Sequence, residues 1–475
     1  MDIDQKIDQL MRPLADTVAE FIFYAVPLGD SPLPLIVVWL IAGGVFFTLY
    51  FRFINLRGFR HALDLVRGKY ADKRDPGEIS QFQALTTAVS GTVGIGNIAG
   101  VAVAISLGGP GATFWLIVAG FLGMSTKFAE CTLAVMYRHT HSDGTVSGGP
   151  MYYLERGLAD RQLPKVGRAL GAFYAAAMVI GCLGIGNMFQ ANQAAAIFID
   201  VTGGSESFFA DKAYLIGLMM AGAVALVIIG GIKSIARTTS KLVPGMALLY
   251  LLAALVVLVG NYQQIPAALV AIWTGAFSPE GVTGGAVGVM ILGFRRAVFS
   301  NEAGLGSAAI AHSTARTPEP VSEGFVGLLE PFIDTVVICT VTALVIVTTV
   351  YDPALAGAGV SGIEMTSRAF ASTLPWLPIP LSIAAILFAF STMVAWSYYG
   401  LKAFTYLVGR KGWAELGFKL FFLVFVVLGS AIQLGALVDL SDALVFVVAI
   451  PNLLGLYLLA PLLRRELNAY ENRRA

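Results

Sequence analysis

The chain has 475 residues, of which 57% are hydrophobic and 13% are charged, and it contains 52 glycines. This composition is too apolar and too rich in glycine for a soluble protein of that length, so we expect a polytopic membrane protein in contact with lipid. The formal net charge of +1 and the lack of arginine-rich tracts argue against nucleic acid as a partner.

Apolar runs long enough to cross a bilayer recur along the whole chain. Crossing roughly 30 Å of hydrocarbon takes about 20 mostly apolar residues. This criterion predicts an all-α protein with about eleven transmembrane helices. They are expected at 31–54, 81–107, 111–137, 166–201, 213–233, 240–260, 283–313, 323–350, 379–408, 415–435 and 437–464.

Lysine and arginine residues collect in every second connection between these spans. Segments 52–80 and 138–168 are the richest, and 233–241 and the tail at 465–475 continue the pattern. The positive-inside rule therefore places the N-terminus outside and the C-terminus in the cytoplasm. An odd number of spans agrees with that orientation.

The first glycine cluster, "SGTVGIGNIAG", lies inside the second span at 90–100. A glycine inside a helix costs about 1 kcal/mol relative to alanine, although glycines also let membrane helices pack closely. Here the glycines alternate with Ser90, Thr92 and Asn97, and irregular backbone at mid-membrane survives only where it is buried in protein or lines a cavity. We expect a broken helix that forms a site, with close helix packing as the alternative.

A second such place is "FRRAVFSNEAGLGSA" at 294–308, in the seventh span. It combines Arg295, Arg296 and Glu302 with Gly304 and Gly306. Each charged residue at the bilayer centre costs about 2.5 to 3.5 kcal/mol on insertion scales, so these side chains need partners or water. A second discontinuous helix is the simplest account.

The spacing of the two breaks indicates an inverted repeat. If the first span and its loop (1–80) are extra, each break falls in the first helix of a five-helix block, 81–260 or 283–464. The blocks begin on opposite sides because five is odd, and interrupted helices at matching positions of inverted halves are typical of secondary transporters. We expect a single transporter domain over 1–475, ending in the tail at 465–475.

Four separated motifs resemble the signatures of the alanine or glycine:cation symporters, over residues 80 to 460 or so. They are "SGTVGIGNIAGVAVAISLGGPGATFW", "GIGNMFQANQ", "FSNEAGLGSA" and "FSTMVAWSYYG". The "VGIGN" segment is also similar to the unwound first core helix of leucine-transporter-type sodium symporters. The resemblance implies a leucine-transporter-like fold in the cytoplasmic membrane of a prokaryote. It also implies inward symport of small neutral amino acids, alanine or glycine, with sodium as the coupling ion and no other cofactor.

The resemblance implies substrate contacts at both breaks, in the fourth span and in the ninth span. The expected substrate-binding residues are Ile95, Gly96, Asn97, Asn187, Gln190, Asn192, Phe299, Ser300, Gly304, Thr392, Met393 and Trp396. At about 100° per residue, Asn187, Gln190 and Asn192 cannot share one helix face. Gln190 is the favoured contact, and interhelical hydrogen bonding is the alternative for these amides.

By the same resemblance, oxygen atoms of the second and ninth spans hold sodium. The expected ligands are the backbone carbonyls of Ser90, Val93 and Phe388 and the hydroxyls of Ser391 and Thr392. Hard oxygen ligands without a thiolate suit an alkali cation. The alternative is that Ser391 and Thr392 bond back to their own helix.

Other intramembrane charges allow two interpretations. They could pair with Arg295 and Arg296 as a gate, or pair with one another structurally, and we expect them near the cytoplasmic ends of their spans. These charged residues are Lys127, Glu130, Glu330 and Asp334.

Several other functions are disfavoured by the sequence. The three cysteines lie in apolar stretches and are expected to pack in the core, and the histidines lie in or at the edges of loops. With no HExxH motif and no histidine buried in a span to act as a base, we expect no enzyme. A channel would need a continuous pore lined by repeated carbonyl or charge rings, so paired breaks favour alternating access. Proton coupling and a broader neutral amino-acid range stay open.

Overall fold

A computed structural model describes residues 12–13, 16–28, 31–277, 285–351, 362–432 and 434–474. The predicted boundaries at residues 1, 283 and 475 lie outside these ranges. The first half contains β1 (Ala25–Leu28), β2 (Ser31–Pro34), α2 (Leu35–Tyr50), α3 (Ile54–Arg57), α4 (Phe59–Val66), α5 (Gln81–Thr92), η1 (Ile95–Asn97), α6 (Ala99–Gly108), α7 (Gly111–Met136), β3 (His139–Thr140), β4 (Val146–Ser147), α8 (Pro150–Asp160), α9 (Pro164–Leu183), the π-helical η2 (Gly184–Met188), α10 (Phe189–Val201), η3 (Gly204–Glu206), α11 (Ala213–Ile228), α12 (Gly231–Gly260), η4 (Tyr262–Gln264) and α13 (Ile265–Phe277).

The second half is helical throughout its described part. It contains α14 (Gly285–Asn301), α15 (Ser307–His312), α16 (Pro320–Gly327), α17 (Leu329–Pro331), the π-helical η5 (Phe332–Cys339), α18 (Thr340–Thr349), α19 (Ile363–Ala371), α20 (Pro378–Val408), α21 (Gly412–Ala431) and α22 (Leu434–Arg474). The two short hairpins, β1 with β2 and β3 with β4, are antiparallel.

The predicted spans all have helical counterparts in the structure. Within the described ranges, 7 helices are long and apolar enough to cross a membrane, or 8 if the bent pair α5 and η1–α6 is counted as one span. The shorter apolar helices α2 and α11, with the broken pair α14 and α15, occupy the remaining predicted positions. The all-α, polytopic class is therefore confirmed.

One predicted connection is wrong. Segment 233–241 was expected to link two spans, but α12 already begins at Gly231, so Lys233, Arg237 and Lys241 lie on its first turns. Lysine and arginine are good helix formers. The turn needs little more than Gly230 and Gly231, and Gly231 adopts a positive φ of 65°.

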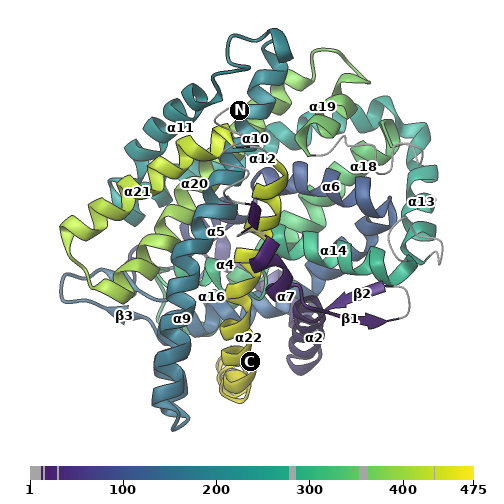
Figure 1. Cartoon of the computed structure of the whole chain (residues 1–475). Coiled ribbons are helices and arrows are strands. Elements are labelled where there is room, and N and C mark those ends of the chain that lie inside the picture. The colour runs from purple at the N-terminus through teal and green to yellow at the C-terminus, as the bar shows by residue number, and fades with distance from the viewer. Residues whose placement is uncertain are drawn as a thin grey trace.

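Both predicted breaks are present. The chain bends by 60° between α5 and the η1–α6 segment. Between α14 and α15 the backbone takes positive φ at Glu302, Gly304 and Gly306, a conformation that glycine adopts without steric cost. Helix α5 packs against α12, α15 and α20, so the first break is enclosed by other helices. Figure 1 shows α5 and α20 near the middle of the bundle, with α11 and α21 on one side and α13 and α14 on the other.

Candidate functional site

The first break brings α5, α10 and α20 together. The N–H of Gly94 donates to Oδ1 of Asn97 at 2.8 Å, and the N–H of Ile95 donates to Oε1 of Gln190 at 3.0 Å. A Cβ on Gly94 would lie 2.6 Å from Oγ1 of Thr392 and 3.0 Å from Oε1 of Gln190. The absence of a side chain at Gly94 therefore allows α10 and α20 to approach the broken backbone.

The expected sodium ligands meet beside this break. Oγ1 of Thr392 donates to the carbonyl of Ser90 at 2.9 Å, across two spans. Oγ of Ser391 donates to the carbonyl of Phe388 at 3.0 Å and lies 3.5 Å from that of Ser90. Ser391 thus also makes the back-bond to its own helix that the alternative predicted, whereas Thr392 reaches across to α5. Val93 is fully buried at the end of α5, next to Gly94.

A buried carboxylate lies on the other side of the first break. Nδ2 of Asn97 donates to Oδ1 of Asp334 at 2.5 Å and to Oγ of Ser300 at 3.0 Å. The hydroxyls of Ser300 and Thr335 donate to Oδ2 of Asp334 at 2.8 and 2.7 Å. Asp334 is fully buried, so neutral donors surround a group that carries a negative charge when ionised.

Three bulky side chains lie near the two breaks. Phe299 is in van der Waals distance of Gly96, because a Cβ there would lie 3.5 Å from the ring, and the ring packs edge-on against Phe189. Nε1 of Trp396 donates to the carbonyl of Gly91 at 3.2 Å and to Oε1 of Glu302 at 3.0 Å. Met393 is fully buried on the same helix as Trp396. Phe299 and Trp396 therefore occupy space beside the first break.

The amides of the fourth span separate into two groups. Gln190 reaches the first break, as described above. Asn187 donates to the carbonyl of Phe422 at 2.7 Å, and Asn192 donates to that of Ile432 at 2.5 Å. These two contacts are interhelical hydrogen bonds toward α21, the alternative that the sequence left open.

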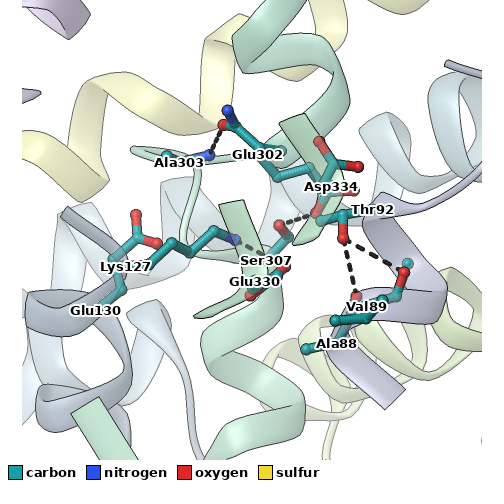
Figure 2. Close-up of polar contacts among 12 residues, drawn as sticks. Ala88, Val89, Thr92, Lys127, Glu130, Glu302, Ala303, Ser307, Glu330 and Asp334 are labelled. Atoms are coloured by element: carbon teal, nitrogen blue, oxygen red, sulfur yellow. Dashed lines mark hydrogen bonds and ion pairs between the residues drawn. The ribbon is translucent and has the colours of Figure 1, made fainter. Parts of the chain in front are cut away.

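Buried charges gather at the second break. Nζ of Lys127 is 3.2 Å from Oε1 of Glu330, and neither side chain is exposed. Oε1 of Glu130 accepts the N–H groups of Gly304 and Gly306, each at 3.0 Å. Figure 2 shows the side chain of Lys127 reaching toward Glu330, with Glu130 beside it on α7.

Both backbone polar groups of Gly304 are hydrogen-bonded at this break. Its carbonyl accepts Nδ2 of Asn452 at 2.7 Å, and its N–H is held by Glu130. Gly304 is therefore held by side chains of α7 and α22.

The chain matches a known family over most of its length. The family model described as "Sodium:alanine symporter family" matches residues 24–475. The chain belongs to this family. The sodium/alanine symporter AgcS of Methanococcus maripaludis is 40% identical to this symporter over 441 residues, covering 92% of this chain and 94% of AgcS. The probable sodium/glutamine symporter GlnT of Bacillus subtilis is 33% identical, covering 92% and 87% of the two chains. The symporter is therefore a multi-pass membrane protein that couples amino-acid transport to a cation.

A solved structure shares the fold of the symporter. The protein in "Crystal structure of MhsT in complex with L-phenylalanine" superposes with a TM-score of 0.59 over 82% of this chain and 98% of that chain, at 15% sequence identity. At this identity the likeness shows the fold alone. It supports the leucine-transporter-like architecture that the motifs implied.

Two sequence-based expectations about the symporter are wrong. Asp334 was expected near a cytoplasmic end, yet it lies at the first break with Asn97 and Ser300. A buried aspartate inside an apolar span is itself a signal of function, and its pairing with Asn97 was hidden because the two residues are far apart in sequence. His312 was expected at a loop edge, and no histidine was expected to be buried in a span, but it ends α15 with no exposed side-chain surface. Glu323 of α16 and Glu330 of α17 face its ring, and α15 packs against α5 and α7.

Proposed function

We propose that this symporter couples inward transport of a small neutral amino acid, alanine or glycine, to the sodium gradient by alternating access. The observation that carries the proposal is the contact between Thr392 and the Ser90 carbonyl beside the broken span. Hydroxyl and carbonyl oxygens from two separate spans there form a donor set suited to an alkali cation. A bound ion would join α5 to α20, and its release would let the two helices separate.

The broken backbone is the proposed site of the substrate carboxylate. The N–H groups of Gly94 and Ile95 are occupied by the neutral oxygens of Asn97 and Gln190. An incoming carboxylate is a stronger acceptor than an amide oxygen and would replace them. Gln190 and Asn97 would then be free to contact the rest of the ligand.

Asp334 is the proposed source of negative charge for a bound cationic group. Its carboxylate is fully buried and is met by Asn97, Ser300 and Thr335, all neutral. A buried charge is costly without a counter-charge. The ammonium group of the substrate or a sodium ion would supply one.

The proposed location is the cytoplasmic membrane of a prokaryote, with the N-terminus outside and the C-terminus inside. The distribution of lysine and arginine between alternate connections supports this orientation. A relative from Bacillus subtilis, at 33% identity, is named a putative sodium/proton-dependent alanine carrier. Proton coupling is therefore the second candidate for this chain.

Uptake by purified protein in liposomes tests the proposal. Labelled alanine is supplied with an inward sodium gradient, with the same gradient of choline, or with a proton gradient alone. We expect accumulation above equilibrium only with sodium. Accumulation driven by protons alone would assign a different coupling ion, and equilibration without accumulation under every gradient would indicate a channel.

A further inference from the structure

A series of buried polar side chains joins five helices at the end of the molecule where α5 begins. Nε2 of Gln81, the first residue of α5, donates to Oε2 of Glu323 on α16 at 3.1 Å. Oε1 of Glu323 lies 2.6 Å from Nδ1 of His312, the last residue of α15. On the far side of the ring, Glu330 of α17 is paired with Lys127 of α7. This series of side chains thus links the start of one broken span to the end of the other.

The two atoms that face each other between His312 and Glu330 make no hydrogen bond in the described part of the chain. Nε2 of the ring and Oε2 of the carboxylate lie 3.8 Å apart, and neither atom has a hydrogen-bond partner within the part of the chain that the structure describes. A neutral imidazole has one donor and one acceptor, and an ionised carboxylate only accepts. If the ring were neutral and Glu323 ionised, the 2.6 Å contact between Nδ1 and Oε1 of Glu323 would use the only proton of the ring. Nε2 would then turn a lone pair toward a carboxylate, which is unfavourable for buried atoms.

Several titratable groups surround this cluster. The neighbouring carboxyl groups are Glu130 and Glu302, the cations are Lys127 and Arg138, and the thiol is Cys131 of α7. The nearby tyrosines, Tyr153 of α8 and Tyr399 of α20, are neutral when protonated. A proton on the ring would lie between the carboxyl groups of Glu323 and Glu330, which face its two nitrogens from opposite sides.

We propose that the cluster of Glu323, His312 and Glu330 binds one proton more than a neutral ring carries. This proton holds closed the end of the molecule where α5 begins and α15 ends. With it, each ring nitrogen donates to one carboxylate, and Gln81 stays bound to Glu323. When this end opens, water reaches the ring and the proton passes to the solution on that side. The assignment of that side to the cytoplasm rests on the proposed function.

Transport at varied pH on one side tests the proposal. With the sodium gradient and alanine fixed in liposomes, uptake is measured while the pH facing the α5 and α15 end is changed. We expect uptake at about pH 6 to be at least ~3-fold slower than at about pH 8, because protonation favours the closed state. His312→Gln should remove this dependence. The matched control is His61→Gln, since His61 is buried against Tyr470 outside the cluster, and it should keep the dependence.

A His312→Gln protein with the pH profile of the unmodified symporter would overturn the proposal. Failure of sodium to drive uptake would instead overturn the proposed function, and the pH profile of the remaining transport would still test the proton site. Nitrogen NMR of the full chain with labelled histidine provides a second measurement if His312→Gln does not fold. When the other three histidines are substituted, the ring-nitrogen signals come from His312 alone. We expect two protonated ring nitrogens at neutral pH, and a single protonated nitrogen would refute the assignment.

Discussion

The two breaks satisfy their free backbone groups in different ways. At the first, amide oxygens of Asn97 and Gln190 accept the N–H groups of Gly94 and Ile95. At the second, the carboxylate of Glu130 accepts those of Gly304 and Gly306. Hydrogen bonds to a charged group are roughly twice as strong as those between neutral groups. A neutral, weakly held break can exchange its partners for a ligand, whereas a break held by a buried carboxylate acts as a fixed support.

The largest effect is expected from removing the carboxylate at the second break. Glu130→Ala leaves the buried N–H groups of Gly304 and Gly306 without their acceptor and removes one of the two hydrogen bonds from Nδ2 of Asn452. Each unsatisfied buried group costs about 1 to 3 kcal/mol. We expect loss of transport and a clearly lower melting temperature in detergent. Glu130→Gln retains an acceptor oxygen and should lose less stability. Equal stability of Glu130→Ala and the unmodified protein would show that the second break is not held by Glu130.

At the first break, Gly94→Ala should weaken sodium and alanine binding together. The added Cβ would lie 2.6 Å from Oγ1 of Thr392 and 3.0 Å from Oε1 of Gln190, so both groups must shift. Overpacking of this kind costs about 1 to 3 kcal/mol, which is on the order of 5- to 150-fold in affinity. The matched control is Gly100→Ala in α6, where no atom lies within 4 Å of the new Cβ. Calorimetry with both ligands measures the effect, and equal affinities in the two variants would disprove the close approach.

Phe299→Ala tests whether the space beside the first break sets substrate size. The ring lies against Gly96 and Phe189, so its removal should admit longer side chains while alanine loses affinity. One methylene of fit is worth about 1 to 3 kcal/mol in such a pocket. Competition of labelled alanine uptake by amino acids from glycine to leucine measures this. Efficient leucine transport by the unmodified protein would contradict a small pocket.

The smallest effect is expected from Thr392→Ala. Its hydroxyl contributes one oxygen beside the Ser90 carbonyl, and one hydrogen-bonding group is worth about 1 kcal/mol, or roughly 5-fold in affinity. We expect a higher sodium concentration for half-maximal uptake. Ser397→Ala on the same helix removes a hydroxyl that bonds within α20 to the carbonyl of Val394, and it should leave sodium dependence unchanged. If Thr392→Ala weakened alanine binding alone, Thr392 would be a substrate contact rather than a sodium ligand.

The spans and both breaks could be predicted from the sequence because their causes are local. A membrane crossing requires a continuous apolar run, and an interrupted helix requires residues such as Gly94 and Gly304 that tolerate irregular backbone. The motif resemblance led to the family for the same reason, since each motif is a short continuous segment. The hydroxyls of Ser391 and Thr392 belong to one such segment.

Only the tertiary structure decided which polar side chains meet. Gln190 and Asn192 lie two residues apart on one helix, yet the first contacts the break and the second faces α21. The helix rotates by about 200° between them, and only the neighbours decide which direction is the site. The pairs of Asn97 with Asp334 and of His312 with Glu323 depend likewise on how separate helices pack. Burial then gives these contacts their strength, because water no longer competes for the same donors and acceptors.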